Sequence, residues 1–167
     1  MNLQFYYERL VDSKECKNFL KENKDAFLCS GLFIIDKSAD KNEVNFDFFS
    51  ALKNEIFSFK LDGEEVKLTP MKNFSSKAPE KLKDNFNLEM DFFEKLVLDK
   101  MKKEGINNQI QKLLFNLQSL EGKNYFVLTG FLSNMALLKA HIDIEKKDFE
   151  FFEKQSILSM MNVFKKK

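Results

Sequence analysis

The chain has 167 residues, with 20 phenylalanines and no tryptophan, and its 27 basic and 26 acidic side chains leave a net charge of +1. This balance argues against nucleic acid or an anionic membrane surface as a partner, and no apolar run is long enough for a signal peptide or a membrane span. Cys16 and Cys29 match no metal or disulfide pattern, which favours buried thiols in a reduced, cytoplasmic protein.

Two short helices are predicted at the start of the chain. Leu3, Tyr6 and Leu10 recur at helical spacing and are expected to face a core. Ser13 is a suitable cap for a second helix, in which Phe19 lies on the apolar face.

A meander of antiparallel strands is predicted next. Residues 26–35 are apolar and rich in β-formers, which is typical of a strand that is buried on both faces. Residues 44–48 and 57–61 alternate between apolar and polar side chains, so each is expected to bury one face. Asp62-Gly63 favours a hairpin into a further strand, which we expect to end at Pro70.

Residues 70–87 contain both prolines and many charged residues, and they are typical of a linker. This interpretation divides the chain into residues 1–69 and 88–167, two halves that are expected to share one core. The length of the chain suits either one domain or two such halves.

A long amphipathic helix and a second meander are predicted after the linker. The helix starts near Leu88 and reaches Gly105, a residue that commonly ends helices. Three strands and a final short helix should follow, at residues 113–117, 125–133, 135–144 and 156–164, with turns at 121–124 and 145–148.

These elements predict an α+β fold with helices packed on antiparallel sheets. The second half contains a long helix, a hairpin around Glu121-Gly122 and a strand that ends in His141-Ile142-Asp143-Ile144. This order of elements resembles the helix-and-curled-sheet unit of cystatin-like folds, including PepSY-type domains. The resemblance covers residues 88–152 and implies a role in inhibition, carriage or binding, with no catalytic residue. The short aromatic sequences at 46–49 and 149–152 are similar to each other, either because the chain holds two such halves or because phenylalanine is abundant.

His141 is the only histidine, and it shares a strand face with Lys139 and Asp143. A His-Asp pair could act as a base or bind a metal ion, but these two side chains are too few for a zinc site. The favoured interpretation is a histidine on a surface or an interface, with no metal or cofactor. Isolated glycines also give no phosphate-binding loop, which makes nucleotide hydrolysis improbable.

Apolar residues on both faces of the last strands predict a binding role. Tyr125, Phe131 and Leu137 need a cover, which could be the other half of the chain, a second copy, a protein or peptide partner, or an apolar ligand. The other half is the preferred cover, followed by a homodimer. The leading hypothesis is a non-enzymatic binding or protein-interaction module. The alternatives are an apolar-ligand carrier with a Phe-lined cavity and an enzyme with a site near His141 and Asp143.

Overall fold

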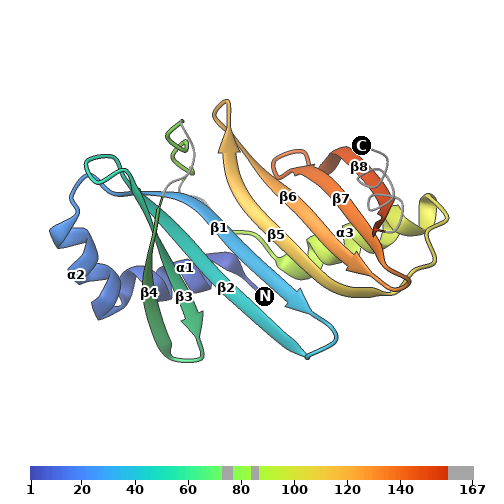
Figure 1. Ribbon diagram of the computed structural model, residues 1–167, viewed down its shortest axis with the longest axis horizontal. Helices are drawn as coiled ribbons and strands as arrows, with labels where there is room; N and C mark the ends of the chain where they lie inside the picture. The colour runs from blue at the N-terminus through green and yellow to red at the C-terminus, as the bar shows by residue number, and fades with distance from the viewer. Residues whose placement is uncertain (73–76, 84–86, 158–167) are drawn as a thin grey trace, which may run out of the picture.

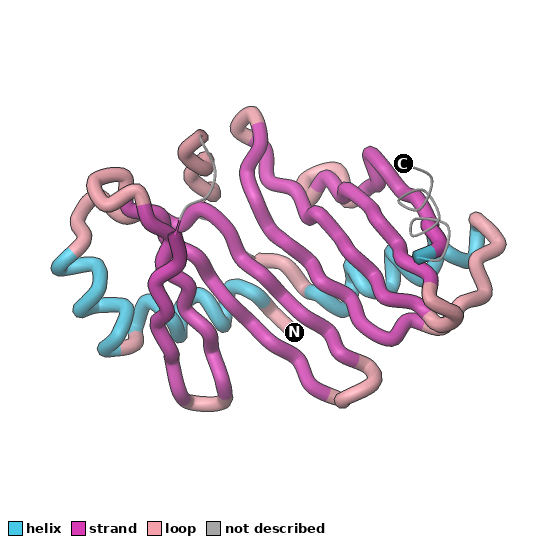
Figure 2. Tube along the Cα trace, in the orientation of Figure 1, coloured by secondary structure: helices cyan, strands magenta, loops and turns pink. Residues whose placement is uncertain are grey.

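The computed structural model describes residues 1–72, 77–83 and 87–157, which form one eight-stranded antiparallel sheet with helices on one face (Figures 1 and 2). The strand order is β4-β3-β2-β1-β5-β6-β7-β8. This arrangement confirms the predicted α+β class. The elements are α1 (Leu3–Asp12), α2 (Lys14–Glu22), β1 (Phe27–Asp36), β2 (Lys41–Ser50), β3 (Glu55–Asp62), β4 (Glu65–Lys72), α3 (Met90–Lys103), β5 (Ile110–Leu120), β6 (Lys123–Leu132), β7 (Ala136–Asp143) and β8 (Asp148–Ser156).

The two predicted meanders are continuous with each other through their first strands. β1 pairs with β5 in antiparallel register from Ser30 opposite Gln118 to Asp36 opposite Lys112. The halves therefore lie edge to edge in one sheet, whereas the sequence suggested two sheets that cover each other. As a result, the first half does not cover Tyr125, Phe131 and Leu137 of the second.

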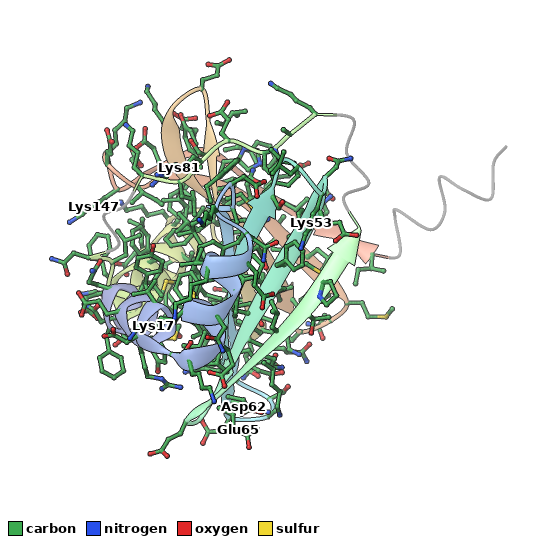
Figure 3. All side chains as sticks on the ribbon, turned by 90° about the vertical axis from the view of Figure 1, so that its left-hand side faces the viewer. Lys17, Lys53, Asp62, Glu65, Lys81 and Lys147 are labelled. Atoms are coloured by element: carbon green, nitrogen blue, oxygen red, sulfur yellow. The ribbon has the colours of Figure 1, made fainter. Side chains whose placement is uncertain are left out.

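Local capping fixes where the first two helices begin. The Asn2 side chain accepts a hydrogen bond from the backbone N–H of Phe5 at the start of α1. Ser13 Oγ accepts from the N–H of Cys16 at the start of α2, as the sequence predicted. In the view from the β4 end, both helices lie to one side of the strands (Figure 3).

Phenylalanine rings fill the space between the helices and the sheet. On α2, Phe19 contacts three rings of β2 and β3, at centroid distances of 4.9 to 6.0 Å. On β6, Phe126 contacts Phe33 of β1, Phe93 of α3 and Phe115 of β5. Because these rings touch each other mainly edge to face, they build a continuous core that includes residues of both halves.

Proline does not end the fourth strand, contrary to the sequence prediction. β4 continues through Pro70, which lies opposite Phe57, and reaches Lys72. A proline is tolerated here because β4 is at the edge of the sheet, where one side of the strand needs no hydrogen-bonded neighbour.

Part of the linker-like segment is packed against the sheet. Leu82 is 1% exposed, and its backbone N–H donates to the carbonyl of Leu28 in β1. The Glu80 carboxylate accepts hydrogen bonds from the backbone N–H groups of Glu121 and Gly122 in the β5–β6 turn. These contacts hold residues 80–82 across both halves of the sheet.

The second half departs from the prediction at its end. α3 ends at Lys103, and Gly105 follows with a φ of +67°, as expected for a helix stop. Residues 149–152, however, belong to an additional strand, β8. The predicted final helix lies outside the described residues beyond Ile157.

Candidate binding site on the outer sheet face

The face of the sheet that points away from the helices, here called the outer face, is turned toward the viewer in Figure 1. β1 was predicted to be buried on both faces, but its outward side chains at Leu32 and Ile34 are only half-buried. They belong to a larger group of apolar residues on the central strands. This outer apolar strip consists of Leu32, Ile34, Leu114, Val127, Phe131 and Leu137.

Strand register places these residues on four strands with polar residues among them, because Thr129 lies opposite Leu114, Asn116 opposite Val127 and Lys112 opposite Phe131. Ile34 of β1 lies opposite Leu114 of β5, and Phe131 of β6 lies opposite Leu137 of β7. Phe131 is 39% exposed, which is high for a large ring on a central strand. No helix or strand among the described residues covers the strip, and its side chains other than Phe131 are half-buried.

A pocket of about 220 Å³ adjoins the strip at Val127. Antiparallel register places Gln118 of β5 opposite Tyr125 of β6, and Val127 opposite His141 of β7. We call this hollow the Tyr125 pocket; it is lined by Gln118, Leu120, Glu121, Tyr125, Val127, His141 and Glu150.

The chemistry of the Tyr125 pocket is aromatic and acidic. The Tyr125 hydroxyl donates to Oε1 of Glu150 over 3.4 Å, and the His141 ring lies 5.5 Å from the ring of Phe151. Burial, followed by the negative charges of Glu150 and Asp143, raises the pKa of the Tyr125 hydroxyl. The lining residues include two carboxylates and no lysine or arginine.

Asp143 is buried at the end of β7 and serves the following turn. Its Oδ1 accepts hydrogen bonds from the backbone N–H groups of Glu145 and Lys146, both at 2.9 Å. Its Oδ2 lies 3.4 Å from the Lys146 ammonium, which is also 3.6 Å from Glu150. Burial opposes ionisation of Asp143, but these hydrogen bonds and the lysine outweigh it and lower the pKa of the carboxyl group.

The structure divides the predicted site residues into three groups. Tyr125 and His141 line the pocket together. Phe131, Leu137 and Lys139 lie farther along the outer face and do not line it. Asp143 is only 3% exposed, and both of its oxygens are engaged in the turn, so the carboxylate that an acid-base pair with His141 would use already has other partners.

Two acidic residues of the pocket were absent from the sequence prediction. Glu150 reaches the pocket because β8 contains an irregularity, in which His141 pairs with Phe151 and Ile142 with Phe149. Glu121 belongs to the β5–β6 turn and has a φ of +52°. The Phe-Glu-Phe-Phe pattern of β8 could have indicated a strand with a bulge.

The cysteines and the acidic residues give no metal site among the described residues, where no group of three or more His, Cys, Asp or Glu side chains is arranged to hold an ion. Cys16 and Cys29 are free and buried. Burial raises the pKa of the Cys16 thiol to about 11. Burial and the nearby Asp47 raise that of Cys29 to about 12. Both thiols are therefore protonated at neutral pH.

Comparison with known proteins identifies a similar fold. No protein-family model matches the chain, and no curated protein matches its sequence. The chain is similar to a crystal structure described as "a putative lipoprotein" from Clostridium difficile 630, with a TM-score of 0.58 and 14% sequence identity, over 84% of this chain and 90% of that chain. At this identity the similarity shows the fold alone. Among the described helices, none has the length and apolar character needed to cross a membrane.

Proposed function

We propose that this protein is a non-catalytic binding module that holds a segment of another protein on its outer sheet face. The observation that carries the proposal is the outer apolar strip, which spans β1, β5, β6 and β7 and has no cover among the described elements. Large exposed apolar patches on monomers commonly serve an interface. Asn116, Thr129 and Lys112 lie among the apolar residues of the strip, and interfaces likewise combine apolar and polar groups.

Protein binding is better supported than the carriage of an apolar ligand in a Phe-lined cavity. Phe33, Phe115 and Phe126 have no exposed surface, and they contact each other or neighbouring rings. The buried phenylalanines are thus used for the core, whereas the exposed ring of Phe131 is on the outer face.

The family and the location of the protein are further parts of the proposal. Two helices in the first half and one in the second precede four meandering strands, an order that agrees with the resemblance to cystatin-like and PepSY-type domains. The free cysteines support a cytoplasmic location, whereas the description of the C. difficile protein as a lipoprotein suggests attachment to a membrane from outside the cytoplasm. Fractionation of cells that produce the full-length protein would decide between the two.

The binding proposal can be tested with displayed peptides. A random peptide library would be selected on the wild-type chain, and the enriched peptides would be measured against Phe131→Lys and Phe92→Lys. Phe92 is a matched control because it is 42% exposed but lies on α3, in the helix layer. We expect Phe131→Lys to weaken binding by at least about tenfold, and Phe92→Lys to change it by less than about twofold.

Two results would contradict the proposal. Enriched peptides that bind both variants equally well would show that the outer face is not the binding surface. A dimer of the wild-type chain that Phe131→Lys fails to form, seen by sedimentation at increasing concentration, would identify a second copy as the occupant of the strip.

A further inference from the structure

The Tyr125 pocket differs in charge from the outer apolar strip that it adjoins. Glu121 and Glu150 line it, and Asp143 lies next to it, opposite Tyr125 in the strand register. The Lys146 ammonium is shared between Asp143 and Glu150. Within this group three carboxylates face one ammonium, and burial, followed by the charges of Glu150 and Asp143, raises the pKa of Tyr125.

We infer that the Tyr125 pocket binds an arginine side chain of the partner protein, an inference that rests on the proposed function of the outer face. A guanidinium group is planar and stacks on aromatic rings, and it donates hydrogen bonds in a fork that fits carboxylates. The pocket presents both features, because the rings of Tyr125 and His141 lie beside the Glu150 carboxylate and the Gln118 amide.

The arrangement of strip and pocket specifies the chemistry of the partner segment. Val127 belongs to both, so a chain that crosses the sheet could place apolar side chains on the strip and an arginine in the pocket. The partner is therefore a segment that combines apolar residues with arginine.

A second copy of this chain is a poor source of that arginine. Arg9 is the single arginine of the sequence. Its guanidinium donates to the carbonyl oxygen of Gly63 in the β3–β4 turn and lies over the ring of Tyr6. Occupation of the pocket by Arg9 of another copy would require these contacts to break, so a different protein fits the site better.

The test uses the full chain labelled with ¹⁵N and titrated with three probes that differ in charge. N-acetyl-arginine amide is the candidate ligand, N-acetyl-citrulline amide is its neutral counterpart of nearly equal shape, and N-acetyl-glutamate amide carries the opposite charge. We expect saturable shifts of the Tyr125, Val127 and His141 amide signals with the arginine probe alone. Equal shifts with citrulline, or no saturable shift with arginine, would overturn the inference.

Variants locate the effect in the pocket. The double substitution Glu121→Gln/Glu150→Gln should weaken binding of the arginine probe by at least about tenfold. Glu153→Gln is the matched control, because Glu153 is an acidic residue of the same strand that does not line the pocket. A similar loss in the control variant would mean that the overall charge of the sheet, rather than the pocket, attracts the probe.

The pocket inference and the binding proposal fail in different ways. If displayed peptides depend on Phe131 but the arginine probe does not bind, the binding face stands and the pocket assignment is wrong. If the arginine probe binds at Tyr125 but no peptide depends on Phe131, the pocket stands and the proposed function of the face is wrong.

Discussion

In the first half of the molecule α1 and α2 precede strands β1 to β4, and in the second half α3 precedes strands β5 to β8. Each meander starts at the centre of the sheet and runs outward to one edge, so β1 and β5 meet in the middle. The two halves thus use the same order of elements to cover one shared core. This likeness makes their outer faces directly comparable.

The outer face differs in chemistry from strand to strand. In the first half, β2 and β3 present polar pairs, such as Lys60 with Glu43 and Ser30 with Asp47 across β1 and β2. In the second half, the outer face presents Leu114, Val127 and Phe131 beside the polar residues Asn116, Thr129 and Lys139. The outer apolar strip also includes Leu32 and Ile34 of β1, so the contrast separates β2 and β3 from the central strands rather than one half from the other.

The turns at Asp36 and Asp143 are held by the same pattern of hydrogen bonds between an Asp side chain and the backbone. Oδ1 of Asp36 accepts from the backbone N–H groups of Ser38 and Ala39, two and three residues ahead, as Asp143 does in its own turn. Oδ2 of Asp36 lies 2.6 Å from Lys112 of β5. The first turn therefore also links the two halves, whereas the partners of Asp143, which are Glu145 and Lys146, belong to its own turn.

The largest expected effect comes from Phe126→Ala, which removes a ring that contacts both halves. Its neighbours include Phe33 at 6.3 Å and Phe93 at 4.9 Å between centroids. Truncation of a fully buried phenylalanine leaves a cavity, so we expect the free energy of unfolding to fall by about 3–5 kcal/mol. Urea unfolding followed by circular dichroism would measure the change.

Thiol labelling shows whether this loss reaches the first half. Cys16 and Cys29 are both in the first half, and their burial and raised pKa values protect them from alkylating reagents in the folded state. In Phe126→Ala, both should be labelled faster, in step with the loss of global stability. If urea unfolding of Phe126→Ala shows a separate, early transition while the labelling rates of both cysteines stay unchanged, the halves unfold independently.

Gly31→Ala should have the next largest effect, because it crowds the junction of the halves. A Cβ atom at Gly31 would lie 2.8 Å from Cζ of Phe33, whose ring is fully buried. Overpacking of this kind costs about 1–3 kcal/mol, which urea unfolding would detect. Gly130→Ala is the control in the second half, where the nearest contact is 3.1 Å, and its loss should be smaller. Equal stability of Gly31→Ala and the wild type would contradict the close packing at the junction.

Much of the fold could be predicted because apolar periodicity and turn residues act locally. The alternation at Val44, Phe46 and Phe48 fixed the buried face of β2, and Ser13 marked the start of α2. The pairing of β1 with β5 could not be predicted, because it joins residues far apart in sequence and no local pattern encodes it. Without that pairing, the apolar outer positions of β1 indicated burial on both faces.

Part of the candidate site could be predicted because strand alternation is a local pattern. Tyr125 and His141 were placed on one face by strand alternation, and antiparallel pairing brought them together. Glu150 was missed because an irregularity in β8 breaks the alternation of apolar and polar residues. Glu121 was missed because its position depends on the conformation of a turn rather than on a periodic pattern.

Asp143→Asn should have a moderate, pH-dependent effect on stability. The folded-state pKa of Asp143 is lowered, so its ionised form stabilises the fold at pH values above the unfolded pKa of about 3.9. This contribution is lost as the pH falls through the lower, folded-state pKa. At pH 7 we expect the melting temperature to fall by about 2–4 °C, and near pH 2 the difference from the wild type should shrink.

A matched comparison is offered by Asp36→Asn. The side chains of Lys112 and Ser38 lower the pKa of Asp36, so the sign of its pH dependence is the same. Thermal unfolding of both variants from pH 7 to pH 2 would test whether the ionised Asp carboxylates stabilise the two turns. A difference from the wild type that is constant over this range would show that the carboxylate charge does not stabilise these turns.

The smallest effect on stability is expected for Phe131→Ser, although Phe131 is on the same strand as Phe126. Phe131 points to the outer face and is 39% exposed, whereas Phe126 has no exposed surface. Its replacement should change the free energy of unfolding by no more than about 1 kcal/mol in urea unfolding, because it opens no closed cavity. A loss as large as that of Phe126→Ala would mean that the strip is part of the core. With a small loss, folding would not require a large apolar ring at this position, which would agree with the proposed contact with a partner.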